Sequence, residues 1–196
     1  MKKLFVLIIL FAVMASVSLS AWEASDLAKF PSCMTEKSWL LNFGVGFHNV
    51  AYGVLFGKNY IFVPPLQLSL DKNVPLGDKG LPFFFGGTVG YWGHGYKYNN
   101  EKWYYSNLTI LGRFGYHFNW GVDKLDTYAV ARLGWSFNIG DKNLWQTSAY
   151  RFYLPDHLRI GVNIGARYYL TDWFGFWAEA GIGTYRSVDI GLAFKF

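Results

Sequence analysis

The sequence predicts an all-β protein, an eight-stranded antiparallel up-and-down transmembrane β-barrel. Eight segments alternate apolar residues with small or polar ones, which is the period of two that a strand gives to its faces. Aromatic residues make up 21% of the chain and charged residues 16%, whereas ordinary soluble domains contain ~25% charged residues. The final segment, Val188–Phe196, is an apolar strand, and an unpaired strand of this kind would invite aggregation. Pairing with the first strand of a closed barrel removes that edge.

The start of the chain has the pattern of a secretory signal peptide. Lys2 and Lys3 precede an apolar run over residues 4–17, and small residues follow; this order is typical of export signals. The run is shorter than the ~20 residues that a transmembrane helix needs. We therefore expect a cleaved signal peptide at residues 1–20, a short N-terminal segment at 21–37 and the barrel at 38–196.

The first three predicted strands show the alternation clearly. Residues 38–48 carry apolar side chains at the odd-numbered positions, and residues 81–93 do so at most of theirs. In residues 61–71 the leucines fall on even-numbered positions and face away from Gln, Ser and Asp. Pro64 and Pro65 interrupt the beginning of this strand, where we expect irregular pairing.

The remaining five strands keep the same period. Their apolar residues fall on even-numbered positions of residues 103–118, 158–170, 173–185 and 188–196 and on odd-numbered positions of residues 127–138. The opposite faces are mostly small or polar, with a few charges. No repeat or interdomain linker interrupts the series, so the predicted strands form one domain.

The predicted connections differ in length. Strands six and seven are joined by Thr171 and Asp172 alone, whereas the links at 48–60, 94–102 and 140–157 are long and polar. Membrane barrels place short turns toward the periplasm and long loops outward. The link at 72–80 is longer than a periplasmic turn usually is. An even number of strands places both chain ends on the periplasmic side.

Alternation alone does not say whether the apolar face meets lipid or lines the ligand pocket of a soluble, lipocalin-type barrel. The opposite face favours lipid, because it is mostly Gly, Ser, Thr and Asn, as a narrow lumen filled by side chains requires. The apolar face also carries aromatic residues near its ends, as membrane interfaces do.

Charged residues on the polar face form a candidate lumen cluster, since buried charges must pair. The cluster consists of Arg113, Arg132, Arg167, Glu179, Asp189 and Lys195. Its structural interpretation is a plug of salt bridges that closes the barrel. Its functional interpretation is a gate whose re-pairing admits water or small ions. We favour the plug, because the interiors of eight-stranded barrels are filled.

Other chemistry is sparse in this sequence. No metal-ligand spacing, phosphate-binding loop or catalytic pair of acidic residues occurs, so we expect no metal, cofactor or catalytic residue. The net charge of +5 falls to about +3 without Lys2 and Lys3, and the basic residues do not gather on one face, so we expect no nucleic-acid partner. Cys33 is the single cysteine and cannot build a disulfide framework.

Three stretches, at residues 112–118, 126–130 and 191–196, look like strand motifs of one family. Through them the chain resembles the small eight-stranded outer-membrane barrels of the OmpA/OmpX type. The last of these stretches looks like the terminal aromatic signal of the family, which implies that Phe194 and Phe196 are read by the outer-membrane assembly machinery. The resemblance also implies a location in the outer membrane of a Gram-negative-type bacterium, in contact with its lipid and lipopolysaccharide.

We expect a monomer with a structural or surface-interaction role, such as adhesion or envelope integrity, carried by its outer loops, with a possible surface ligand. Two alternatives stay open, a narrow pore and a lipid A-modifying enzyme of the deacylase or acyltransferase type. The deacylases carry a His-x-Ser arrangement, which His117-Phe118-Asn119 lacks. Other candidates for the enzyme are grouped in the predicted loops, namely His48, His94, Ser148, Asp156 and His157.

Overall fold

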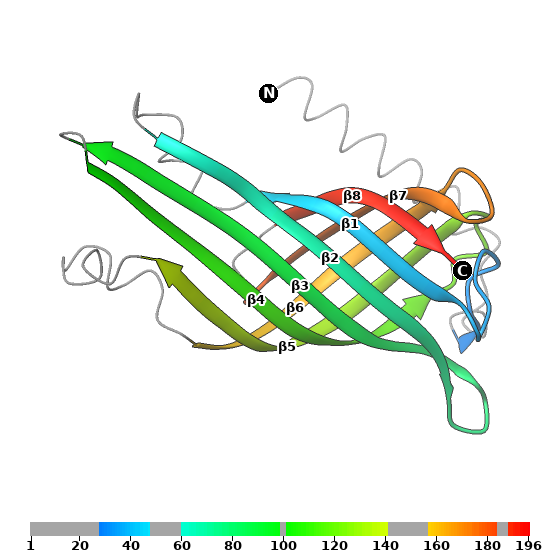
Figure 1. Ribbon diagram of the computed structural model, residues 1–196. Helices are drawn as coiled ribbons and strands as arrows, with labels where there is room; N and C mark the ends of the chain where they lie inside the picture. The colour runs from blue at the N-terminus through cyan, green and yellow to red at the C-terminus, as the bar shows by residue number, and fades with distance from the viewer. Residues whose placement is uncertain (1–27, 48–59, 99–100, 141–156, 184–187) are drawn as a thin grey trace, which may run out of the picture.

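The computed structural model describes residues 28–47, 60–98, 101–140, 157–183 and 188–196. Eight strands close into one barrel in which each pairs antiparallel with its neighbours in sequence, and β1 pairs with β8 (Figure 1). The strands are β1 (Trp39–Phe47), β2 (Tyr60–Leu76), β3 (Leu81–Tyr98), β4 (Glu101–Phe118), β5 (Leu125–Gly140), β6 (His157–Tyr169), β7 (Phe174–Ile182) and β8 (Val188–Lys195). The predicted all-β, eight-stranded, up-and-down barrel is therefore confirmed.

The closing seam is a regular antiparallel ladder. Its register runs from Leu40 opposite Lys195 to Phe47 opposite Val188. Beyond the ladder, the amides and carbonyls of Trp39 and Phe196 exchange two hydrogen bonds, each 2.9 Å long. The C-terminal apolar strand thus has the partner that its pattern requires.

Two predicted connections are shorter than the sequence indicated. Residues 72–76 continue β2, and the turn is confined to residues 77–80, where Gly77 and Gly80 take positive φ values of 71° and 60°. In the region 94–102, β3 runs to Tyr98 and β4 starts at Glu101. The alternation is weak in these stretches because they are rich in Gly, Tyr, Asn and Lys, and ladder pairing extends the strands nevertheless.

The prolines of β2 produce the irregularity predicted for them. The β2–β3 register shifts between Val63 and Leu66, so the ladder is interrupted at Pro64 and Pro65. Proline lacks the amide hydrogen that a ladder needs, and a bulge accommodates the loss.

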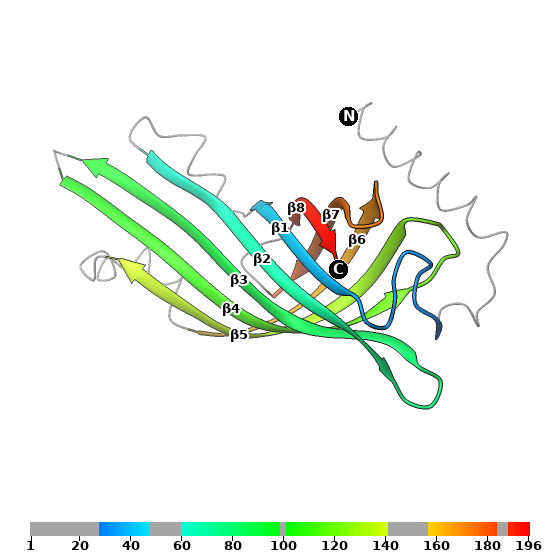
Figure 2. The ribbon, with the colours of Figure 1, turned by 45° about the vertical axis from the view of Figure 1, so that its right-hand side comes forward.

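The barrel wall is much taller on one side than on the other. Strands β2 to β5 have 16 to 18 residues, whereas β1, β7 and β8 have 8 or 9. Figures 1 and 2 show β2–β5 extending well past the other strands at one end of the barrel. We call this the far end.

The opposite end is here called the base. It contains the N-terminal segment as the structure describes it (residues 28–38), the turns at 77–80, 119–124 and 170–173, and Phe196. In Figure 1 the N-terminal segment and the C-terminus lie together at this end. The described start of the chain, the short turns and Phe196 therefore lie at the same end of the barrel.

Candidate functional site

The two faces of the barrel wall have opposite chemistry. Of the side chains that are buried in the described residues, nineteen are polar or charged and ten are hydrophobic. Large apolar side chains instead face outward, with Ile164 67%, Ile160 64% and Phe85 54% exposed. The usual arrangement of a soluble protein, with an apolar inside and a polar outside, is inverted here.

The lumen contains a chain of eight ionisable side chains in which basic and acidic groups alternate at every step. In order, the members are His117, Asp126, Arg167, Asp71, Arg113, Glu179, Arg132 and Asp189. We call this set the lumen chain. His117 bears its full positive charge only when both ring nitrogens carry hydrogen.

Arg167 and Arg113 form the centre of the lumen chain. Arg167 donates to Asp126 Oδ2 at 2.6 Å and to Asp71 Oδ2 at 3.0 Å. Arg113 donates to the other oxygen of Asp71 at 2.8 Å and to Glu179 Oε2 at 3.1 Å. Each guanidinium thus bridges two carboxylates from different strands. The planar fork of arginine suits this role better than the single ammonium of lysine.

The two ends of the lumen chain differ in how tightly they are held. His117 Nδ1 lies 2.6 Å from Asp126 Oδ1. At the other end, Arg132 Nη2 donates to Glu179 Oε1, while Arg132 Nη1 lies 3.9 Å from Asp189 Oδ2. That last separation allows attraction between charges but exceeds hydrogen-bond distance. The contact between His117 and Asp126 is therefore shorter than that between Arg132 and Asp189.

The lumen chain, together with two neutral partners, links all eight strands of the barrel. Its members come from β2, β4, β5, β6, β7 and β8. The remaining two strands contribute neutral partners, since Asn42 Oδ1 of β1 accepts from Arg167 Nε at 2.9 Å and Thr88 Oγ1 of β3 accepts from Arg113 Nη1 at 3.4 Å. Removing one charge leaves its partner buried and unpaired, which lowers the free energy of unfolding by several kcal/mol at a buried pair. The network therefore fixes the barrel's cross-section.

Aromatic rings pack against the charged groups near the base. The Arg167 guanidinium lies 4.1 Å from the ring centroid of Tyr128, whose hydroxyl donates to Glu179 Oε2 at 3.0 Å. Tyr128 and Phe84 meet edge to face, with centroids 5.5 Å apart. A Cβ at Gly165 would lie 2.3 Å from Tyr128 Cζ, so glycine is required where the ring crosses β6. These rings fill the space between the charges.

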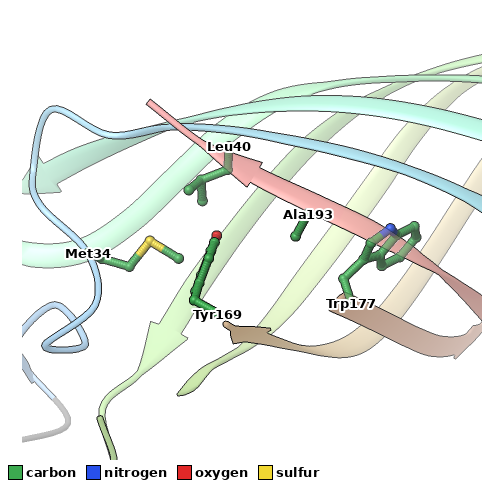
Figure 3. Close-up of a cluster of buried hydrophobic side chains, with 5 residues drawn as sticks. All are labelled: Met34, Leu40, Tyr169, Trp177 and Ala193. Atoms are coloured by element: carbon green, nitrogen blue, oxygen red, sulfur yellow. The ribbon is translucent and has the colours of Figure 1, made fainter. Parts of the chain in front are cut away.

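The N-terminal segment covers the base of the lumen. Met34 packs with Leu40, Tyr169, Trp177 and Ala193, and Figure 3 shows it reaching from the segment toward Leu40 and Tyr169. This small apolar cluster joins β1, β6, β7 and β8 from inside the barrel.

Hydrogen bonds also hold the segment to the barrel. Thr35 O accepts from Asn73 Nδ2 at 2.8 Å, and Phe30 O accepts from Asn119 Nδ2 at 3.2 Å. Cys33 O accepts from Lys195 Nζ. Burial raises the pKa of the Cys33 thiol to about 12, with a further contribution from the nearby Asp126 carboxylate. The thiol therefore stays protonated at neutral pH.

Five of the six predicted cluster residues lie in the lumen chain, namely Arg113, Arg132, Arg167, Glu179 and Asp189. Lys195 lies apart from it, with its ammonium on the Cys33 carbonyl and 4.9 Å from the ring centroid of Tyr169. Lys195 is the last residue of β8 and lies beside the N-terminal segment.

Sequence reasoning did not assign Asp71, Asp126 and His117 to the cluster. Asp71 alternates with the leucines of β2, which is a sufficient signal for a lumen-facing carboxylate. Asp126 lies one residue before the predicted start of its strand, whereas β5 begins at Leu125. His117, considered in the sequence as a possible enzyme residue, is fully buried and contacts Asp126.

The other predicted sites have fewer observations. His94 lies within β3 and His157 begins β6, while His48, Ser148 and Asp156 lie outside the described residues. Phe194 packs at the base against Trp173 and Phe174, with ring centroids 6.2 Å and 5.5 Å away. Phe196 is 70% exposed. Within the described ranges no group of three or more His, Cys, Asp or Glu could hold a metal ion, and no helix there is long and apolar enough to cross a membrane.

Fold and lumen together define a class, a closed eight-stranded barrel whose interior is filled by paired charges and whose outer face is apolar. Comparison with models of protein families and with curated proteins gave no match to this chain.

Proposed function

We propose that the protein is an integral outer-membrane barrel of a Gram-negative-type bacterium and that its far end serves as an interaction surface outside the cell. The observation that carries the proposal is the inversion of the barrel wall, with charges buried inside and large apolar side chains exposed outside. In water such an outer face would drive aggregation. In a bilayer it is the face that acyl chains cover.

Aromatic residues at the base support this orientation. Exposed rings of Trp39, Trp173, Tyr168 and Phe196 lie at the ends of strands near the base, where membrane barrels carry an aromatic girdle. Lys72 Nζ lies 5.0 Å from the ring centroid of Trp39, a pairing suited to an interface of lipid and water. The base would then face the periplasm. Phe194 and Phe196 would then be read by the outer-membrane assembly machinery, as the family resemblance implies.

The height of β2–β5 supports a role for the far end. These strands are up to nine residues longer than β1 and β7, which is about 30 Å along a strand. A closed lumen gives no reason for this extra height. A raised sheet would instead present backbone and loop residues to a surface ligand such as lipopolysaccharide, a host surface or another envelope protein.

Fractionation of cells that express the full chain tests the membrane part of the proposal. We expect the protein in the outer-membrane fraction, where an unboiled sample should migrate as a compact band that shifts on heating. Recovery in the soluble periplasmic fraction would contradict it and would favour the lipocalin-type alternative.

A shortened variant tests the role of the far end. Replacing residues 94–102 with a two-residue Asn-Gly turn should leave outer-membrane assembly unchanged and abolish binding to lipopolysaccharide-coated or host-cell surfaces. Equal binding by the full chain and the variant would contradict the interaction role.

Two further experiments test the alternative functions. Lipid A analysed by mass spectrometry should be unchanged by the protein, since we propose no catalytic activity, and planar bilayers should show no conductance. A new lipid species or a stable current would support the enzyme or the pore.

A further inference from the structure

We propose that His117 carries hydrogen on both ring nitrogens in the folded protein, and that this imidazolium fastens the N-terminal segment over the base of the barrel through Asn73. The inference rests on the partners of the two ring nitrogens and on the contacts of Asn73 with the segment.

The first ring nitrogen faces an ionised carboxylate. His117 Nδ1 lies 2.6 Å from Asp126 Oδ1, and the second oxygen of Asp126 accepts from Arg167 Nη1 at 2.6 Å. The arginine keeps this carboxylate ionised, so Asp126 is an acceptor on both oxygens. Nδ1 must therefore be the donor.

The second ring nitrogen also faces an acceptor. His117 Nε2 lies 3.0 Å from Asn73 Oδ1. The orientation of the Asn73 amide is fixed at its other end, where Nδ2 donates to Thr35 O at 2.8 Å. A reversed amide would oppose Oδ1 to the Thr35 carbonyl, with two acceptors in contact. Nε2 must therefore donate as well, which makes the ring an imidazolium.

Among the described residues, the ring of His117 has no hydrogen-bond partner other than Asp126 and Asn73. The ring is fully buried. Its neighbours are the rings of Phe84, Tyr128 and Phe30, with centroids 4.8, 6.4 and 5.9 Å away. The charged groups near it are Asp126 and, through that carboxylate, Arg167. No water is needed to complete the hydrogen bonds of the ring.

Asn73 transmits the state of this ring to the N-terminal segment. Its side chain holds Thr35 O, and its backbone amide donates to Ser38 O at 3.1 Å. If Nε2 lost its hydrogen, a lone pair would face Asn73 Oδ1. Asn73 would then have to turn and release Thr35 or bear the repulsion. The hydrogen bond from Asn73 to Thr35 O is thus kept without repulsion only while His117 is charged.

The first test is the nitrogen spectrum of the ring. The full chain, labelled with ¹⁵N in its histidines and refolded in detergent micelles, is examined at pH 7.5, and a His117→Gln sample assigns the signals. We expect both nitrogens of His117 to show shifts of the protonated type. One nitrogen of the unprotonated type would overturn the assignment.

The second test uses Cys33 as a reporter, because it is the single cysteine and lies in the segment. Its protection is the alkylation rate in urea divided by the rate in the folded state at the same pH. We expect protection to fall about tenfold or more in His117→Gln and in Asn73→Ala, since each removes hydrogen bonds that hold the segment.

Asp189→Asn is the matched control, because it removes one charge from the opposite end of the lumen chain. Its Cys33 protection should stay within about twofold of the parent value, since no bond to the segment is lost. Only protein that migrates as the compact folded band is scored. Protection retained in His117→Gln, or lost equally in Asp189→Asn, would overturn the proposal.

Discussion

The two halves of the lumen accommodate their buried polar side chains in different ways. Toward the base, arginines and carboxylates pair among aromatic rings beneath the N-terminal segment. Toward the far end neutral groups bond to one another, since Asn107 Nδ2 donates to Ser136 Oγ at 2.7 Å while Thr109 Oγ1 donates to Asn107 Oδ1 at 2.8 Å. The amides of Gln67 and Asn163 are buried without a hydrogen-bond partner among the described residues.

This comparison indicates that hydrogen-bonded charge pairs lie where the N-terminal segment covers the lumen. A buried ion pair needs each of its partners in position, whereas a neutral amide exchanges a protein partner for water at small cost. We therefore expect substitutions near the base to be severe and substitutions toward the far end to be mild.

The largest effect should come from Arg167→Met. This change keeps the length of the side chain but leaves Asp71 and Asp126 without their shared guanidinium. We expect a loss of about 3–5 kcal/mol in the free energy of unfolding, measured by urea titration of the barrel in lipid vesicles. A loss below about 1 kcal/mol would show that the charged base is no more sensitive than a surface ion pair.

Cys33 should be strongly shielded from alkylation. Because burial raises its pKa to about 12 from the ordinary value of 9.0, the folded thiol has far less thiolate at pH 8 than the unfolded one. We expect iodoacetamide to react about a thousandfold more slowly with the folded protein, in proportion to the thiolate fraction.

The same shift predicts a dependence of stability on pH. The folded pKa is raised, so the stabilisation associated with the neutral thiol is complete below pH 9 and is lost as the pH rises toward 12. Cys33→Ser removes a thiol of similar size and should abolish this part of the decline. Parallel curves for the two proteins between pH 9 and 12 would contradict the assignment.

Gly165→Ala should have an intermediate effect at the base. The added Cβ would lie 2.3 Å from Tyr128, a ring that cannot move freely because it bonds Glu179 and stacks on Arg167. Overpacking of this kind costs about 1–3 kcal/mol. Gly87→Ala is the control, since its nearest neighbour would be 3.8 Å away. Equal unfolding curves for the two variants would show that the rings near the base are loosely packed.

Much of this architecture could be predicted from the sequence because a strand's period is local. Alternation located all eight strands, and lumen-facing arginines followed from their place in it. The height of β2–β5 could not be predicted, because residues such as Gly95 and Lys97 do not favour a strand locally, and they join the ladder only through pairing with β4.

The contacts between the residues of the site could not be predicted from the sequence either. Asp71 and Arg167 are 96 positions apart and come from strands that are not neighbours, so they meet only across the closed lumen. The role of Asn73 depends on a hydrogen bond to the N-terminal segment, whose sequence has no periodic signal. Register in a strand is local, whereas contact across a barrel depends on how far its strands are staggered.

The smallest effect should come from the far half of the lumen. Gln67→Leu replaces an amide that pairs with no described group by a side chain of similar volume. No hydrogen bond to another described residue is broken, and an unpaired buried amide is itself costly. We therefore expect the free energy of unfolding to change by less than about 1 kcal/mol, with either sign, in the urea titration used for Arg167→Met. Asn163→Leu should behave alike. A loss of about 3 kcal/mol in either variant would place an essential hydrogen bond in the far half, and the contrast between the two halves of the lumen would then be wrong.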